Sequence, residues 1–406
     1  MTVEETTRFQ QEIFDELTGN ILPFWISKTI DSEFGGFYGQ INGQGEVIQS
    51  ADKGGILNSR ILWTFSSAYH RLGNPEYLKA AEYSKDYILK YFFDADYGGT
   101  YWKLTCNGTP ADTKKQIYSQ AFFIYALSEF YKASGDNTCL NKAISLFNII
   151  EEYSFDNRLN GYFEAYSRDW KLLEDLRLSD KDANEKKTTN THLHILEAYT
   201  NLYLVWKDKL LESKLRNLVN LFLNTIVDPV SHHLLLFFDE KWNSKSSLVS
   251  YGHDIEASWL ILEGAVALED GNLIAEAKSV CTSLAVASLE GLQEDGSLIY
   301  EKDDAEKVPD MDRHWWPQAE AMVGLMNLYE MTHQEIYLSR AVQCWNFIRD
   351  NLVDRKNGEW YWSIRADGTV NVADDKAGFW KCPYHNSRAC LEVLTRSKRI
   401  SRLPEK

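Results

Sequence analysis

Positive charge is scarce in this chain. Its 406 residues include 43 Lys and Arg against 59 Asp and Glu, which gives a net charge of −16. Nucleic acids and anionic membranes bind proteins through clustered Lys and Arg, so this balance argues against both as partners. The sequence also contains no run of about 18 apolar residues, the length that spans a bilayer. It therefore predicts a globular protein that binds neither nucleic acid nor membrane.

Cysteine is also sparse. The six cysteines are spread between Cys106 and Cys390, without a Cys-x-x-Cys pair or a tight framework typical of disulfide-stapled proteins. Residues 1–15 are charged and amphipathic, and they lack the basic start, apolar stretch and cleavage site of a secretion signal. We therefore expect reduced thiols and a cytoplasmic location.

Several functional motifs and all obvious linkers are missing. No Gly-x-x-x-x-Gly-Lys-Ser/Thr loop occurs, and no Gly-x-Gly-x-x-Gly follows a predicted strand, so a nucleotide cofactor is not expected. The neighbouring His192 and His194, and the pair His232 and His233, lack the His-Glu-x-x-His pattern of a zinc site. We predict no cofactor and no metal. Without a Pro-, Gly- or Ser-rich linker, residues 1–406 are predicted to form one domain.

Aromatic residues, by contrast, make up 13% of the chain. Many lie in tracts that begin with Asp or another polar residue, and such tracts recur six times at nearly even spacing. They cover residues 31–39, 94–102, 156–166, 228–238, 293–300 and 354–362. Internal repetition of this kind predicts stacked supersecondary units, with the tracts forming short strands or hairpins.

Apolar residues at helical spacing predict twelve helices between and beside these tracts. They cover residues 6–27, 54–72, 75–92, 116–134, 138–153, 189–206, 208–226, 253–269, 271–288, 314–332, 335–351 and 384–397. We predict an all-α fold, an (α/α)6 barrel with short β-hairpins in the loops at one end. An open solenoid is the alternative, but it needs polar capping repeats that do not stand out here.

Residues able to bind ligands or move protons recur near the start of every second helix. They are Arg60, Tyr118, Asn190 with His194, His253 with Glu256, His314 with Trp315 and Trp316, and His385. In the predicted barrel the inner helices run the same way, so these residues would gather at one mouth. The helix N-termini there carry partial positive charge and favour anions.

The strongest local signal is Tyr-Gly-His-Asp-Ile-Glu-Ala-Ser-Trp at residues 251–259. His253 and Glu256 are three residues apart and share a helix face, so the carboxylate is expected to hold the imidazole in one tautomer and keep it basic. A helix cap with a buried Glu–His pair is an equally good interpretation. His385 follows Pro383 at the start of the last helix. Two imidazoles on opposite faces of a planar enediolate would invert a stereocentre next to a carbonyl.

Other candidates have both a functional and a structural interpretation. Asn190 shares a helix face with His194, yet Asn is also a common helix cap. Arg60 lies in an apolar segment and therefore needs a partner, either an inner carboxylate or a developing oxyanion. Core packing is the default for Trp316 and Trp380.

A glycoside hydrolase using two carboxylates is the rival function. The available acidic residues are Asp310, Asp312, Glu320, Asp374 and Asp375. The recurring positions are dominated by His, which favours proton transfer over hydrolysis.

The quoted segments resemble the N-acylglucosamine 2-epimerase family, and within it most closely the enzymes that act on cellobiose. The resemblance rests on residues 35–39, 51–63, 190–199, 251–259, 314–320 and 380–385, which together span nearly the whole chain. It implies an (α/α)6 barrel and a cofactor-free epimerase of the reducing-end glucose of β-1,4-linked disaccharides, which would convert cellobiose to glucosylmannose and lactose to epilactose. Relatives acting on monosaccharides, some of them aldose–ketose isomerases, leave the preferred sugar open.

The resemblance also implies roles for individual residues. His253 and His385 would be the acid/base pair, and His194 would assist ring opening. Arg60, Tyr118, Asn190 and Glu256 would surround the reacting sugar, with Trp315, Trp316, Glu320 and Trp380 completing the binding site. A small-molecule sugar is then the expected partner, and we expect a monomer.

Overall fold

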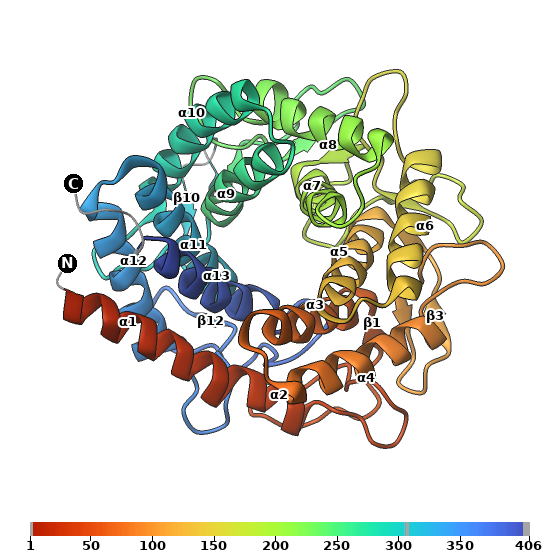
Figure 1. The fold of residues 1–406 in the computed structure, drawn as a ribbon, viewed down its shortest axis with the longest axis horizontal. Coiled ribbons are helices and arrows are strands. Elements are labelled where there is room, and N and C mark those ends of the chain that lie inside the picture. Colours follow the sequence, from red (N-terminus) through yellow and green to blue (C-terminus); the bar gives the residue numbers. More distant parts are fainter. Residues whose placement is uncertain (1–2, 304, 306–307, 401–406) are drawn as a thin grey trace.

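The computed structural model describes residues 3–303, 305 and 308–400 as two concentric rings of helices (Figure 1). The inner ring consists of α3 (Gly55–Leu72), α5 (Ile117–Ser134), α7 (Thr189–Tyr203), α9 (Tyr251–Ala267), α11 (Trp315–Thr332) and α13 (Tyr384–Ile400). The outer ring consists of α1 (Val3–Glu16) with α2 (Leu22–Lys28), α4 (Pro75–Tyr91), α6 (Asn137–Tyr153), α8 (Lys209–Leu221), α10 (Gly271–Ser288) and α12 (Glu335–Phe347). All twelve predicted helices are present, and the predicted (α/α)6 barrel is confirmed.

The two ends of the chain close the ring. Each inner helix packs against the next one along the chain, and α13 packs against α3 on one side and α11 on the other. The outer partner of α13 is α1, so the sixth helix pair joins the first and last helices. The open-solenoid alternative is therefore wrong, because the helices that would have been its exposed ends cover each other.

Burial differs between the two rings as their positions require. In α5, every residue from Ile117 to Phe130 is buried. In α8 the buried positions include Leu211, Leu215 and Leu218, which form one stripe at helical spacing. An inner helix is surrounded by neighbours, whereas an outer helix needs only one apolar face.

Helix boundaries follow local capping chemistry. Gly73 ends α3 in the left-handed conformation, with φ of 74°, and Asn74 then caps α4 by accepting a hydrogen bond from the Glu76 N–H. Asp136 and Asp270 cap α6 and α10 in the same way. Three outer helices end in a turn of π-helix that the apolar spacing did not predict. These turns are η1 (Leu17–Ile21), η2 (Phe222–Ile226) and η4 (Ile348–Leu352), and a 3-10 turn, η3 (Leu289–Gly291), follows α10.

A layer of short strands lies where the inner helices begin, whereas the aromatic tracts themselves are mostly turns closed by isolated bridges, such as Phe93–Thr100 and Val353–Trp360. The strands are β1 (Lys53–Gly54), β2 (Lys103–Leu104), β3 (Pro110–Asp112), β4 (Lys115–Gln116), β5 (Ala165–Tyr166), β6 (Lys187–Thr188), β7 (Phe237–Phe238), β8 (Leu248–Val249), β9 (Glu301–Asp303), β10 (Val308–Asp310), β11 (Arg313–His314) and β12 (Ser363–Ile364). The strand before an inner helix pairs with a strand of the next repeat in β1–β2, β4–β5, β6–β7, β8–β9 and β11–β12. A bridge between Ile41 and Ala377 links the last repeat to the first. Every inner helix start is therefore tied to its neighbour.

Buried ion pairs fix four of these repeats. The Asp that begins the tract turns the chain by accepting backbone N–H bonds, and a lysine from the following segment reaches its carboxylate. The pairs are Lys53–Asp31 at 2.7 Å, Lys115–Asp94 and Lys187–Asp156 at 2.9 Å, and Lys376–Asp354 at 2.5 Å. The lysines are 1% exposed or less, so each charge depends on its partner.

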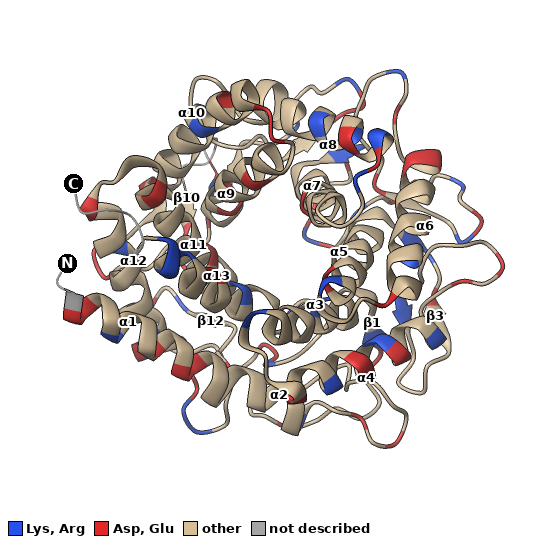
Figure 2. Ribbon diagram, viewed as in Figure 1, with Lys and Arg blue, Asp and Glu red and all other residues tan. Residues whose placement is uncertain are grey.

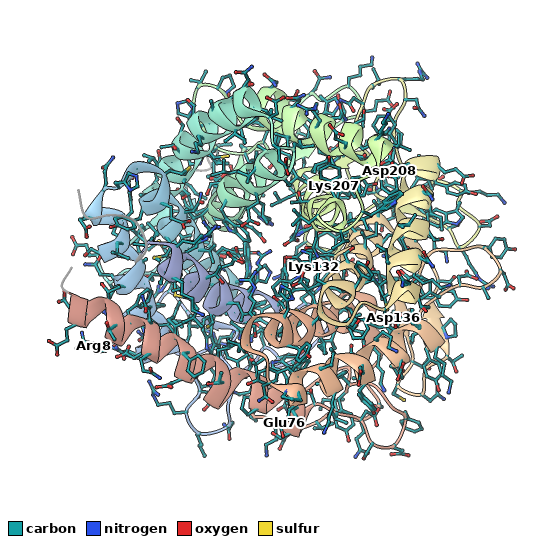
Figure 3. All side chains as sticks on the ribbon, in the orientation of Figure 1. Arg8, Glu76, Lys132, Asp136, Lys207 and Asp208 are labelled. Carbon is teal, nitrogen blue, oxygen red and sulfur yellow. The ribbon has the colours of Figure 1, made fainter. Side chains whose placement is uncertain are left out.

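Charged residues of both signs occur on the inner helices as well as on the outer surface (Figure 2). Side chains of the inner helices project toward the centre of the inner ring (Figure 3). Among the described residues, no helix is both long and apolar enough to cross a membrane.

Removing one partner of a buried pair should unfold the protein more readily. We expect Lys187→Met to lower the free energy of unfolding by about 3–5 kcal/mol, because it leaves the Asp156 carboxylate without its cation. The double variant Asp156→Asn/Lys187→Met removes both charges and should recover part of the loss. Thermal unfolding measures both effects, and a wild-type midpoint for Lys187→Met would show that the pair is unimportant.

Candidate active site

The inner helices present functional side chains at two levels below the mouth of the barrel. The upper level lies at the second or third residue of a helix and comprises Tyr118, Asn190, His253, Trp316 and His385. The lower level lies one turn further along and comprises Arg60, His194, Glu256, Glu320 and Arg388. Residues three or four apart share a helix face, so the two levels stack on one another.

His385 is held by a carboxylate from the neighbouring helix. Its Nδ1 lies 2.7 Å from Oε1 of Glu320, and the other oxygen of Glu320 accepts a 3.1 Å hydrogen bond from Nε1 of Trp259. An ionised carboxylate only accepts, so Nδ1 carries the proton and Nε2 is the free basic atom. Burial lowers the pKa of His385 well below its usual value, which keeps the imidazole neutral.

His253 has a different partner from the one its sequence predicts. Its Nδ1 lies 2.8 Å from Oγ of Ser250, while Oε1 of Glu256 accepts a 2.6 Å hydrogen bond from Nη2 of Arg388. The expected His253–Glu256 hydrogen bond is therefore wrong, because the buried guanidinium takes the carboxylate. Burial lowers the pKa of His253 to about 4, so this imidazole is also neutral near pH 7.

The indole of Trp316 packs beside both imidazoles. The ring of Trp316 lies 4.8 Å from that of His253 and 5.7 Å from that of His385, centre to centre. Trp316 is half-buried and so offers part of its surface to a ligand. Two neutral bases from α9 and α13 therefore share one aromatic platform.

Arg60 is a buried cation without an acidic partner. Its Nη2 donates a 2.7 Å hydrogen bond to the hydroxyl of Tyr118, and its guanidinium lies 4.1 Å from the ring centre of Phe122 and 4.8 Å from that of Tyr384. No carboxylate of the described residues lies within 4.0 Å of it. The salt-bridge interpretation of Arg60 is therefore wrong, and its positive charge remains available to an anion.

His194 forms a second His–carboxylate pair at the lower level. Its Nδ1 lies 2.9 Å from Oε2 of Glu197, and its ring packs on Tyr118 and Phe122. Burial alone would raise the pKa of Glu197, but Arg388 and His194 outweigh it and lower that pKa to about 2. Glu197 is therefore an anion that fixes the His194 ring.

Arg388 joins the carboxylates of this region. Ligand atoms of Glu256, Glu320 and His385 lie within 4.8 Å of one another, a grouping compatible with a metal ion. Nη2 of Arg388 lies 2.6 Å from each of the two carboxylates, so a guanidinium already supplies the positive charge there. The donor set therefore fits an arginine-centred network better than a metal site.

Sequence reasoning missed Glu197 and Arg388. One signal was available, because His194 and Glu197 repeat the three-residue spacing of His253 and Glu256. Arg388 also follows His385 by three residues, which places both on one face of α13.

A small pocket lined by Asn190 and His253 extends toward the segment from Leu176 to Glu185. Oδ1 of Asn190 is buried and has no hydrogen-bond partner, and the same is true of Oε2 of Glu256. Unpaired buried acceptors cost free energy unless a ligand donates to them. These two oxygens suit a ligand with several hydroxyl groups.

Two aromatic candidates have different surroundings. Trp380 is half-buried and packs beside Tyr118, with ring centres 6.2 Å apart. Trp315 is only 3% exposed and packs on Trp362 at 4.6 Å, with the ammonium of Lys381 over its ring. The contacts of Trp315 are thus with the strand layer rather than with the two histidines.

The acidic residues proposed for hydrolysis are dispersed. Asp312 accepts a hydrogen bond from the Ala366 N–H, and Asp375 accepts one from Gln40. Asp310 and Asp374 are exposed. Glu320 alone lies beside the histidines.

Comparison with known proteins identifies the family of this chain. The family model of N-acylglucosamine 2-epimerase matches residues 36–389. The cellobiose 2-epimerase of Bacteroides fragilis is 54% identical over 95% of this chain and 98% of its own, and that of Ruminococcus albus is 40% identical over the same shares. The structure of cellobiose 2-epimerase from Bacillus thermoamylovorans matches with a TM-score of 0.92 and 41% identity, over 96% of this chain and all of that one. The chain therefore belongs to the N-acylglucosamine 2-epimerase family and is a carbohydrate epimerase.

Proposed function

We propose that this enzyme epimerises C2 of the reducing-end glucose of β-1,4-linked disaccharides. Cellobiose would give 4-O-β-D-glucosyl-D-mannose, and lactose would give epilactose. The observation that carries the proposal is the pair of neutral imidazoles, the half-buried His253 and the buried His385, which both pack beside the ring of Trp316. The similarity to cellobiose 2-epimerases supports the choice of a disaccharide.

The chemistry needs proton transfer only. One imidazole removes the C2 proton of the open-chain sugar, the electrons of that bond form the C1–C2 double bond, and the C1 oxygen becomes an oxyanion. The first imidazolium releases its proton to solvent, and the second imidazole takes one up from solvent, which the negative enediolate favours. After rotation of the intermediate, that imidazolium returns a proton to the opposite face of C2. No metal or redox cofactor enters these steps.

Other residues would stabilise and orient the sugar. Arg60 faces the developing oxyanion with an uncompensated charge and holds the Tyr118 hydroxyl in place. His194, fixed by Glu197, would transfer protons at O1 and O5 during ring opening. Asn190 and Glu256 offer their unpaired oxygens to sugar hydroxyls. Trp316 and Trp380 offer partly exposed rings for stacking, and Glu320 would act through His385, to which it is bound.

Two rivals differ from this proposal in specific ways. An aldose–ketose isomerase or a monosaccharide epimerase would use the same enediolate, and isomerisation differs only in returning the proton to C1. The 54% identity to a cellobiose 2-epimerase favours a disaccharide. A hydrolase needs two free carboxyl groups across the bond. Glu320 is instead bound to His385, Trp259 and Arg388.

The cytoplasmic location and the monomeric state stay predictions.

Loss of either base should abolish turnover. We expect His253→Ala and His385→Ala to convert no cellobiose while unfolding near the wild-type temperature, because each removes one of two required proton carriers. Proton NMR distinguishes glucosylmannose from free glucose as the product. His333→Asn is the matched control, because His333 ends α11 in the left-handed conformation that Asn tolerates. Full activity in either alanine variant would refute the two-histidine mechanism.

Arg60 should act on the rate more than on stability. Removing one oxyanion donor typically raises the barrier by about 3–4 kcal/mol, so Arg60→Ala should lower kcat at least about a hundredfold. Its loss breaks no ion pair with a carboxylate of the described residues, and we expect only a small change in thermal midpoint. Wild-type turnover by Arg60→Ala would show that the guanidinium merely fills space.

The imidazole of His253 should stay neutral far below the usual pKa of histidine. Burial favours the neutral form in the folded protein, so we expect histidine-selective NMR of the free enzyme to show protonation only near pH 4. The unfolded chain binds this proton near pH 6.5, so stability should decrease as pH falls from about 6.5 toward 4. A midpoint above pH 6 for His253 would contradict the burial argument.

A further inference from the structure

We propose that Arg388 is a positioning residue that links the His194–Glu197 and His385–Glu320 pairs and keeps both imidazoles in their reactive form. The inference rests on the proposed function, because it assigns Arg388 a part in the same reaction. Arg388 itself is not expected to touch the sugar. It would act through the carboxylates that hold the two histidines.

The guanidinium binds one carboxylate from each of three helices. Nη2 lies 2.6 Å from Oε1 of Glu256 on α9 and 2.6 Å from Oε1 of Glu320 on α11. Nη1 bonds to Oε1 of Glu197 on α7 and to the Tyr384 hydroxyl. The side chain is 1% exposed, so these contacts are made away from bulk water. A planar fork of donors suits such a geometry better than an ammonium.

Two of these carboxylates also contact a histidine. Oε1 of Glu320 lies 2.7 Å from Nδ1 of His385, and Oε2 of Glu197 lies 2.9 Å from Nδ1 of His194. A single glutamate therefore lies between Arg388 and each imidazole. Moving the guanidinium would rotate both carboxylates and with them the basic Nε2 atoms of both rings.

The charges around these groups come from every neighbouring inner helix. Arg388 faces Glu197, Glu256, Glu320 and Tyr384, while the charges that act on His385 are those of Glu256, Arg60, Arg388 and His194, besides its partner Glu320. Burial and the two arginines lower the pKa of His385, whereas Glu256 raises it. Without Arg388, three carboxylates would stay close together with no guanidinium among them. The imidazole of His385 would then bind a proton more readily.

A second arginine on the same helix provides a matched control. Arg396 is 2% exposed and pairs with Glu263 at 3.2 Å, with Glu392 at 3.5 Å and with Glu330. Both guanidiniums also lie near the ring of Trp259, at 4.7 Å for Arg388 and 5.9 Å for Arg396. Among the described residues, no histidine hydrogen bonds to the three carboxylates of Arg396. Arg396 follows Arg388 by eight residues, toward the C-terminal end of α13 and away from the helix starts at the mouth.

The test compares Arg388→Met with Arg396→Met in kinetics and in NMR. For Arg388→Met we expect kcat to fall roughly tenfold to a hundredfold, with KM within about threefold of wild type. The acid limb of kcat/KM and the NMR titration of His385 should both move up by about one pH unit or more, because a nearby cation no longer opposes protonation. For Arg396→Met we expect a lower thermal midpoint and an unchanged acid limb.

Two results would overturn the proposal. One is a wild-type acid limb and His385 titration in Arg388→Met, and the other is an equal shift in Arg396→Met. If Arg388→Met does not fold, Arg388→Lys becomes the test variant, because lysine keeps the positive charge but lacks the planar set of guanidinium donors. It should keep the acid limb and lose about tenfold in kcat, and a wild-type kcat would overturn the proposal. The NMR titration needs no substrate, so a wild-type enzyme without turnover on cellobiose would refute the proposed function while leaving Arg388 testable.

Discussion

The packing of α13 against α3 and α11 is the contact on which the rest of the site depends. It closes the ring, and it brings residues from the end of the chain beside residues from its first half. Arg388 reaches Glu197, which is 191 positions earlier, and Cys382 lies against Arg60. Because the strand layer ties every inner helix start to its neighbour, the side chains at the mouth are held by backbone pairing rather than by flexible loops.

The two buried arginines of this site have different electrostatic surroundings. Arg388 is surrounded by Glu197, Glu256 and Glu320, so its charge is more than matched. Arg60 meets a tyrosine hydroxyl, a thiol and aromatic rings. A buried cation that lacks a carboxylate is costly in the free enzyme, and its value appears when a negative intermediate forms beside it. Under the proposed mechanism, the unmatched Arg60 would stabilise the negative charge that develops during reaction.

The sequence predicted most of the fold, because helix periodicity, capping residues and the repeated tracts are local signals. The π turns that extend α8 and α12 carry no such signal. The residues at the mouth could be predicted from their shared position near helix starts, but their partners could not. The shared helix face of His253 and Glu256 predicts that they pair with each other. In the structure Arg388 of α13 binds Glu256, and the Ser250 hydroxyl contacts His253 instead. Such choices depend on contacts between distant segments.

The fate of the C2 proton tests the central claim most directly. Cellobiose incubated with the enzyme in heavy water should give glucosylmannose that carries deuterium at C2, because the second imidazole is protonated from solvent before it delivers. Proton NMR of the isolated product measures this incorporation. A product that retains the original C2 proton would contradict the account, since transfer through two histidines replaces that proton with one from solvent.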